Sequence, residues 1–166
     1  MSSDPNAEDP NSKDLKAKKG HIDRTAARLF AVQALYQMDI AQSPLENIID
    51  EFRAYRLDHD QEELSFSDVD DALFDRIMRG VVSDQVAIDQ AVNDRLSDRW
   101  PLARVDSTMR AIFRAGAFEL MNLVETNSKI LVSEYTDIAH SFFEGPEVGM
   151  VNAVLDRVAK DFAANS

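Results

Sequence analysis

Residues 21–40 read HIDRTAARLFAVQALYQMDI, and this stretch predicts an amphipathic helix over about residues 23–41. Its apolar positions recur three and four residues apart, as one face of an α-helix requires: Ala27, Phe30, Ala31, Ala34, Leu35 and Met38. Arg24 and Arg28 are four residues apart, so we expect them on the same helix face. These arginines stand out because the chain carries a formal net charge of −12.

The next helix begins in the segment SPLENIIDEF, residues 43–52, which carries the signature of a helix start. Ser43 is the expected cap, Pro44 the first helical residue, and Glu46 is placed to complete a capping box. A long helical region follows from Ser67 and Asp70 to about residues 95–98, either continuous or broken near Gly80. The dipeptide Trp100-Pro101 is expected to end that region.

Three more helices are predicted over about residues 105–124, 129–143 and 147–162. Gly116 falls on the apolar face of the first of these and predicts a close helix–helix approach there.

The expected fold class is all-α: a compact array of six or seven helices in two small packed bundles. Residues 21–166 form one domain in this interpretation, with a subdomain boundary near residues 99–104. Residues 1–20 are polar, contain two prolines and are expected to be a disordered basic tail.

Charge is unevenly distributed along the chain. Residues 1–30 hold six lysines and arginines against five acids, so the remainder holds 12 basic residues (18 − 6) and 25 acidic ones (30 − 5). An acidic body argues against general nucleic-acid binding, because phosphate attraction needs positive charge. Any RNA binding is therefore expected to be focal and assisted by a partner. Within residues 58–75, eight acids occur with no basic residue, which favours a solvated acidic loop.

Several kinds of chemistry lack their motifs in this sequence. It contains no cysteine, its three histidines (His21, His59 and His140) are far apart, and it has no glycine-rich phosphate loop. Its paired acids lie in polar runs without the apolar surroundings that tune a catalytic carboxylate. We expect no enzyme activity, no cofactor and no metal site. An apolar run of membrane-span length and a signal peptide are also absent, which predicts a cytoplasmic protein.

Recognition of a nucleic acid has better candidates. The segment KDLKAKKGHIDRTAAR, residues 13–28, combines four lysines, among them Lys18 and Lys19, with Arg24 and Arg28. Arginine on a helix suits phosphate and base-edge contacts, and lysines on an arm add reach. Tyr36 and Trp100 are possible platforms for stacked bases, although core packing is the favoured interpretation of both.

Four blocks occur in order: RTAARLFAVQALYQMDI, MRAIFRAGAFELM, LVSEYTDIAHSFF and GMVNAVLDRVAKDF. Together they resemble the NusB family of bacterial transcription antitermination factors, over about residues 22–163. The family pattern is roughly an arginine-rich opening before A-x-Q-x-L-Y, then R-x-I-L-R-x-A-x-Y-E-L. The last two blocks of the pattern are I-N-E-A-V-E-L-A-K-x-F and F-V-N-G-V-L-D.

The resemblance implies two helical bundles and no catalysis. It implies pairing with a small-subunit ribosomal protein, called NusE in this role. Together the two would bind the single-stranded boxA element of nascent ribosomal RNA leaders and help RNA polymerase pass termination signals. A basic partner would supply the missing positive charge, and we expect the acidic surface around residues 58–75 to attract it.

The resemblance also implies which residues approach the RNA. The family's arginine-rich opening falls on Arg24, Thr25 and Arg28, with Thr25 and Ala26 where relatives often carry arginine, and Lys18 and Lys19 are expected to compensate. The last block appears as MVNAVLD, residues 150–156. There the resemblance implies RNA contacts by Met150, which replaces an aromatic residue, and by Asn152.

Arg110, Arg114 and Glu119 match the second block. Ion pairs within or between helices are the favoured interpretation of these three residues.

The sequence is compatible with two other functions. One is the N-terminal helical module of an rRNA cytosine methyltransferase family, which would need a second α/β domain with a cofactor-binding glycine loop. Residues up to Ser166 contain neither. The other is an interaction protein that uses the same fold without RNA.

Overall fold

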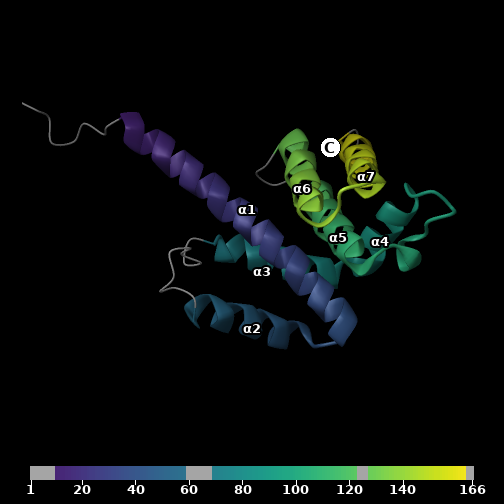
Figure 1. Cartoon of the computed structure of the whole chain (residues 1–166), viewed down its shortest axis with the longest axis horizontal. Helices are drawn as coiled ribbons and strands as arrows, with labels where there is room; N and C mark the ends of the chain where they lie inside the picture. The colour runs from purple at the N-terminus through teal and green to yellow at the C-terminus, as the bar shows by residue number, and fades with distance from the viewer. Residues whose placement is uncertain (1–9, 59–68, 123–126, 164–166) are drawn as a thin grey trace, which may run out of the picture.

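The computed structural model describes residues 10–58, 69–122 and 127–163, which are mostly α-helical (Figure 1). No strand occurs in these residues, so the predicted all-α class is confirmed. The seven helices are α1 (Pro10–Ala41), α2 (Leu45–Asp58), α3 (Asp71–Ser83), α4 (Gln85–Asn93), α5 (Ser107–Met121), α6 (Ser128–Phe142) and α7 (Pro146–Ala163), with a 3₁₀ turn, η2, at Leu102–Arg104.

Helix α5 is the central element of the packing. It contacts α1 and α3 on one side, α6 and α7 on the other, and α4 near its start. The long helix α1 runs diagonally across the molecule, with α2 and α3 packed along its C-terminal half (Figure 1). Nine side chains or glycine positions of α5 are buried: Met109, Ala111, Ile112, Phe113, Ala115, Gly116, Ala117, Phe118 and Leu120. One apolar core therefore extends through both halves of the chain.

Helix α1 is longer than the sequence predicted. It begins at Pro10 rather than near residue 23, so the expectation of disorder is wrong for residues 10–20, while residues 1–9 lie outside the described part. Proline is well tolerated in a first helical turn, and extending an existing helix costs far less than nucleating one. The helix ends where Gln42 adopts the left-handed conformation, with φ 56°.

The start of α2 differs from the predicted capping box. Leu45 is its first residue, and the carbonyl of Pro44 accepts hydrogen bonds from the Asn47 and Ile48 amides. The carboxylate of Glu46 instead accepts from the Arg79 guanidinium on α3, at 2.6 and 3.3 Å. Glu46 thus pairs with Arg79 on the neighbouring helix in place of the backbone amide that a capping box would use.

The long helical region after residue 70 is broken at Asp84 and not at Gly80. Asp70 caps α3, since its carboxylate accepts a hydrogen bond from the Leu73 amide at 3.0 Å. Ser67, the other predicted start residue, lies outside the described residues. Gly80 continues the helix because the ring of Phe118 lies directly on it, in the space that a Cβ would occupy.

The remaining helices are close to the predicted ones. Asp106 caps α5 by accepting from the amides of Thr108 and Met109, and Asn127 caps α6 by accepting from the Lys129 amide. Gly116 confirms the predicted close approach: a Cβ there would lie 2.9 Å from a Leu155 methyl on α7 and 3.3 Å from the Tyr135 ring on α6.

The segment between α4 and α5 contains the predicted boundary at residues 99–104. Arg110 of α5 holds this segment by donating hydrogen bonds to the carbonyls of Leu102, Ala103 and Val105 at 2.8–3.1 Å. A division into two subdomains stays a prediction. None of the described helices is long and apolar enough to cross a membrane.

Candidate RNA-binding surface

Arg28 is buried, with only 1% of its surface exposed. Its Nε donates to Glu119 Oε2 at 2.8 Å, and one terminal nitrogen donates to Glu119 Oε1 at 3.2 Å. The other terminal nitrogen lies 3.6 Å from Glu134 Oε2. Arg28 therefore joins α1 to α5 and α6 through two carboxylates and has no exposed edge for a phosphate.

Two hydroxyl groups complete this cluster. The Tyr135 hydroxyl donates to Glu119 Oε2 at 2.5 Å, and the Thr25 hydroxyl donates to Glu134 Oε2 at 2.9 Å. We call these five residues, Thr25, Arg28, Glu119, Glu134 and Tyr135, the Arg28 cluster. Its donors satisfy carboxylates that would otherwise be charged and unpaired inside the protein.

The pKa values in the cluster follow from burial and charge. Burial alone lowers the pKa of Arg28, but the hydrogen bond and negative charge of Glu119 more than offset it, so the pKa is raised. The pKa of Tyr135 is well above its usual value of 10.0, because burial and then the Glu119 carboxylate both disfavour the phenolate. Arg28 and Tyr135 therefore both keep their protons at neutral pH, so the cluster holds α1, α5 and α6 together through these hydrogen bonds.

This arrangement corrects the sequence interpretation of the two arginines. They lie one turn apart on α1, as predicted, but only Arg24 is exposed. The physical reason is that Arg28 lies on the same face as Ala27 and Ala31, both fully buried, whereas Arg24 lies one turn closer to the end of the packed region. Thr25 is half-buried and engaged with Glu134.

Lys18 and Lys19 are exposed on the N-terminal half of α1, which extends beyond the other helices (Figure 1). Arg24 points back along this half, since a Cβ on Gly20 would lie 3.3 Å from an Arg24 guanidinium nitrogen. Long helical side chains commonly lean toward the N-terminus in this way. The positive charge of Arg24 therefore extends toward the lysines and away from the core.

Met150 and Asn152 lie in the first turns of α7. Met150 is half-buried against the core, and Asn152 is exposed. Helix α6 lies between α1 and α7 (Figure 1). The seven predicted RNA-binding residues are consequently divided among an exposed basic segment of α1, the buried Arg28 cluster and the start of α7.

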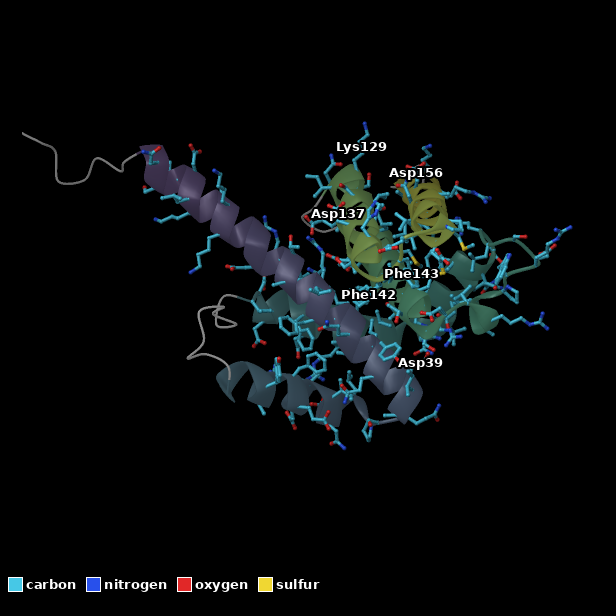
Figure 2. All side chains as sticks on the ribbon, viewed as in Figure 1. Asp39, Lys129, Asp137, Phe142, Phe143 and Asp156 are labelled. Carbon is cyan, nitrogen blue, oxygen red and sulfur yellow. The ribbon has the colours of Figure 1, made fainter. Side chains whose placement is uncertain are left out.

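The structure confirms the ion-pair interpretation of the second sequence block. Arg110 donates to Asp39 Oδ2 at 2.6 Å, and Arg114 makes two hydrogen bonds of 2.9 Å to Asp89. Glu119 pairs with Arg28 as described above. Side chains from α1, α4 and α5 contribute to these pairs, which connect the central helix to its neighbours. Figure 2 labels one of them, Asp39, near the C-terminal end of α1.

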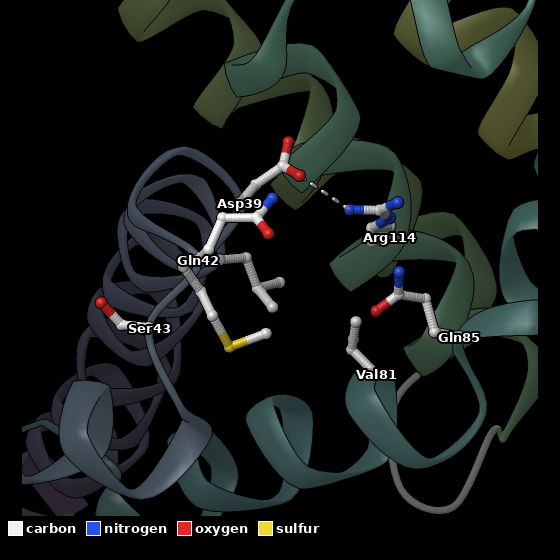
Figure 3. Close-up of a pocket in the computed structure, with 8 residues that line it drawn as sticks. Asp39, Gln42, Ser43, Val81, Gln85 and Arg114 are labelled. Atoms are coloured by element: carbon white, nitrogen blue, oxygen red, sulfur yellow. Dashed lines mark ion pairs between the residues drawn. The ribbon is translucent and has the colours of Figure 1, made fainter.

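A polar pocket of about 240 Å³ lies beside Arg114 where α1, α3, α4 and α5 meet (Figure 3). Asp39, Gln42 and Gln85 line it together with Arg114, and Asp39 lies 3.8 Å from the Arg114 guanidinium. The Arg114 guanidinium is therefore already paired with two carboxylates, those of Asp39 and Asp89.

Among the described residues no group of three or more histidines, cysteines or acids is arranged to hold a metal ion.

The two candidate base platforms are both on the surface. Tyr36 is 39% exposed on α1, and Trp100 is 54% exposed in the segment between α4 and α5. The core-packing interpretation favoured from sequence is therefore wrong for both. For Tyr36 a signal was available but was not used: it falls outside the apolar stripe of residues 21–40.

The described residues form seven helices, five of which (α1, α3, α4, α6 and α7) pack against the central α5, with a buried charged cluster and a projecting basic segment; they define a small all-helical protein. The sequence profile described as the NusB family matches residues 25–160. The chain therefore belongs to the NusB family, a family of non-catalytic transcription antitermination factors, and it is not an enzyme.

Individual relatives agree with this assignment. Transcription antitermination protein NusB of Caulobacter vibrioides is 46% identical over 138 residues, covering 83% of this chain and 93% of the relative. The protein of the same name from Mesorhizobium japonicum is 49% identical over 137 residues, covering 82% and 88%. A solved structure of T. maritima NusB superposes with a TM-score of 0.69 at 26% identity, over 84% of this chain and 92% of that one.

Proposed function

We propose that this chain acts in the bacterial cytoplasm with a NusE-type ribosomal protein. The pair binds the boxA element of nascent ribosomal RNA leaders, and the complex joins RNA polymerase to support transcription past termination signals. Family membership supports the antitermination role. The observation that carries RNA binding is the exposed Arg24 on a lysine-bearing helix of an otherwise acidic chain.

Within this proposal the predicted residues have different roles. Arg24 contacts phosphate or a base edge, and Lys18 and Lys19, on the preceding turns of the same helix, add positive charge, because all three side chains are exposed. Arg28 and Thr25 are positioning residues, since their hydrogen bonds to Glu119 on α5 and Glu134 on α6 hold α1 against these two helices. Asn152 and Met150 provide a polar and an apolar contact at the start of α7.

An acidic chain needs a basic partner to bind RNA tightly. The net charge of −12 favours association with a basic ribosomal protein by long-range attraction, and the pair then presents less negative charge to the phosphates. Residues 58–75 were expected to be the docking surface; residues 59–68 of that segment lie outside the described part. That assignment stays a hypothesis. Neutralising these acids should weaken NusE binding in a salt-dependent way if it is correct.

The decisive experiment measures binding of boxA RNA and of a scrambled RNA at fixed KCl, with and without NusE. Wild-type protein should gain affinity and specificity when NusE is present. Replacing Arg24→Ala should weaken the ternary complex about fivefold, as expected for one exposed charged contact of about 1 kcal/mol.

Arg76→Ala is the matched control, because Arg76 is exposed on α3. It should leave ternary binding unchanged. If NusE adds neither affinity nor preference for boxA, the proposed function is wrong. If Arg24→Ala and Arg76→Ala behave alike, Arg24 is not an RNA contact.

A further inference from the structure

The N-terminal part of α1 lies outside the residues that the family profile matches. The family profile begins at residue 25, whereas α1 begins at Pro10 and runs without interruption into the bundle. In Figure 1 residues near the start of α1 project away from the other helices. This projecting segment, residues 10–20, therefore precedes the residues that the family profile matches and is joined to them by one uninterrupted helix.

Helical spacing places three basic residues of α1 in one row. Lys13, Lys16, Gly20 and Arg24 follow one another at intervals of three, four and four residues, which keeps them on one face. The same row continues with Ala27 and Ala31, which are fully buried in the core. The face of α1 that packs against the bundle thus becomes a positively charged face once the helix leaves the bundle.

Gly20 makes this row continuous. A Cβ at residue 20 would lie 3.3 Å from the Arg24 guanidinium, so the bare glycine lets Arg24 lie close along the helix toward Lys16. From Lys13 to Arg24 the row spans about 16 Å of helix axis at about 1.5 Å per residue. A row of this length matches an extended polyanion better than a single bound phosphate.

The composition of the projecting segment favours a polyanion over an apolar groove as its partner. It carries four lysines and one acid, Asp14, in a chain of net charge −12. Leu15 is its exposed large apolar side chain, at 65%, and an amphipathic docking helix would need a stripe of such residues. The segment is too polar to be stabilised by burial, so its interactions are electrostatic.

We propose that the projecting segment of α1 binds the phosphates of single-stranded RNA that flanks the boxA element, through Lys13, Lys16 and Arg24. This inference rests on the proposed function, because Arg24 connects the row to the surface proposed for boxA. The segment lengthens the RNA footprint beyond the family domain without reading bases. Residues 24–28 contain only two arginines, and the lysines of the projecting segment add positive charge next to them.

The test uses the full chain with NusE and two RNAs, boxA alone and boxA flanked on both sides by uridine tracts. Affinity is measured from about 50 to about 200 mM KCl for wild type, Lys13→Gln/Lys16→Gln and the control Lys160→Gln. Glutamine and lysine have similar helix propensity, so far-UV circular dichroism should be unchanged. Lys160 is a suitable control because its side chain is 73% exposed on α7.

For the flanked RNA, the double variant should reduce the slope of log K against log salt by about 1.4, or about 0.7 for each lysine. Over that fourfold salt range the wild-type loss of affinity then exceeds the variant's loss by about sevenfold. Binding of boxA alone should be unchanged, Lys160→Gln should match wild type, and Lys13→Arg/Lys16→Arg should retain the wild-type slope.

An unchanged slope on the flanked RNA overturns the inference, because Lys13 and Lys16 then neutralise no RNA phosphate. An equal loss on both RNAs also contradicts it, because the row would then contact boxA itself. Failure of the proposed function is distinguishable, since wild-type protein with NusE would then not prefer boxA over a scrambled sequence.

Discussion

Arg24 and Arg28 show how two identical residues one helical turn apart acquire different roles. Arg24 lies at the edge of the packed region and keeps its guanidinium exposed. Arg28 is enclosed by α5 and α6, and two carboxylates and two hydroxyl groups complete its surroundings. Removing both arginines together would therefore confuse loss of RNA contact with loss of structure.

Arg28→Met should destabilise the fold by about 3–5 kcal/mol, because it leaves Glu119 and Glu134 without their cationic partner inside the protein. Urea unfolding followed by circular dichroism measures this cost. Arg24→Ala is the matched control and should stay within about 0.5 kcal/mol of wild type, as an exposed substitution does. Equal stabilities of the two variants would mean that the Arg28 cluster does not stabilise the fold.

Tyr135 gives the cluster a pH dependence. Its pKa is raised in the folded state, by burial and then by Glu119, so the associated stability is fully present below the unfolded pKa of about 10. That stability is lost as the pH rises from there through the folded pKa. Wild type should lose stability above about pH 10 by up to about 1.4 kcal/mol per pH unit relative to Tyr135→Phe.

Urea midpoints of both proteins at about pH 8 and about pH 11 measure this difference. At about pH 8, Tyr135→Phe should be less stable by about 1–2 kcal/mol, since a hydrogen bond to a carboxylate is lost. The gap should narrow at about pH 11. A constant gap would show that Tyr135 ionises equally in both states.

At the scale of elements, the glycines show where helices approach closely. Gly80 lies in the last turn of α3 and Gly116 in the interior of α5, and glycine by itself disfavours a helix. Both are retained in helices because a neighbouring side chain occupies the Cβ position: Phe118 at Gly80, and Leu155 with Tyr135 at Gly116. Helix packing has therefore overridden local propensity at both positions.

Gly80→Ala should destabilise the protein by about 1–3 kcal/mol, although alanine favours helix formation, because its Cβ would overlap the Phe118 ring. Gly149→Ala is the control, since nothing lies within 4 Å of a Cβ at that position of α7. That variant should gain up to about 1 kcal/mol. Thermal unfolding measures the stability of both variants. If Gly80→Ala were stabilised as Gly149→Ala is, the contact between Gly80 and the Phe118 ring would not restrict residue 80 to glycine.

For the whole molecule, α5 joins the two halves of the chain. It packs against α1 and α3 from the first half and against α6 and α7 from the second, and Asp39 of α1 pairs with Arg110 of α5. Neither half can keep its apolar surface buried without this helix. Residues 99–104, where the subdomain boundary is predicted, lie between α4 and α5, and one cluster of buried apolar residues includes side chains from both halves.

We expect one cooperative unfolding transition. Trp100 is the single tryptophan and lies at that boundary, so its fluorescence reports on the junction, while circular dichroism reports on all helices. The two signals should follow the same urea curve. Two separate transitions would show that the halves are independently stable and would support the predicted subdomains.

Most helices could be predicted from sequence, because each has apolar residues at helical spacing and several have a polar cap. The ends of α5, α6 and α7 fell within three residues of those expected. The start of α1 was missed because its first turns have no apolar stripe, and helix there is propagated from residues 21–41. The break at Asp84 was misplaced because Gly80 is the stronger local signal.

The candidate site was only partly predictable. Arg24, Lys18 and Lys19 could be found because charge clustering is a local property of the sequence. The burial of Arg28 depends on Glu119 and Glu134, which are 91 and 106 residues away in sequence. One signal was available: Glu134 lies in the apolar stripe of its helix, between Leu131 and Ile138, where an acid needs a buried partner.

The sequence by itself determined the helical class, the succession of most helices, the charge contrast and the family, since periodicity, composition and motif order are all local features. Only the tertiary structure decided that Arg28 is a buried joint, that Tyr36 and Trp100 are exposed, and that α1 projects beyond the bundle. The physical reason is that a helix face has no fixed environment until its neighbours are placed. On α1 the same face is buried where α5 and α6 cover it and positively charged where they end.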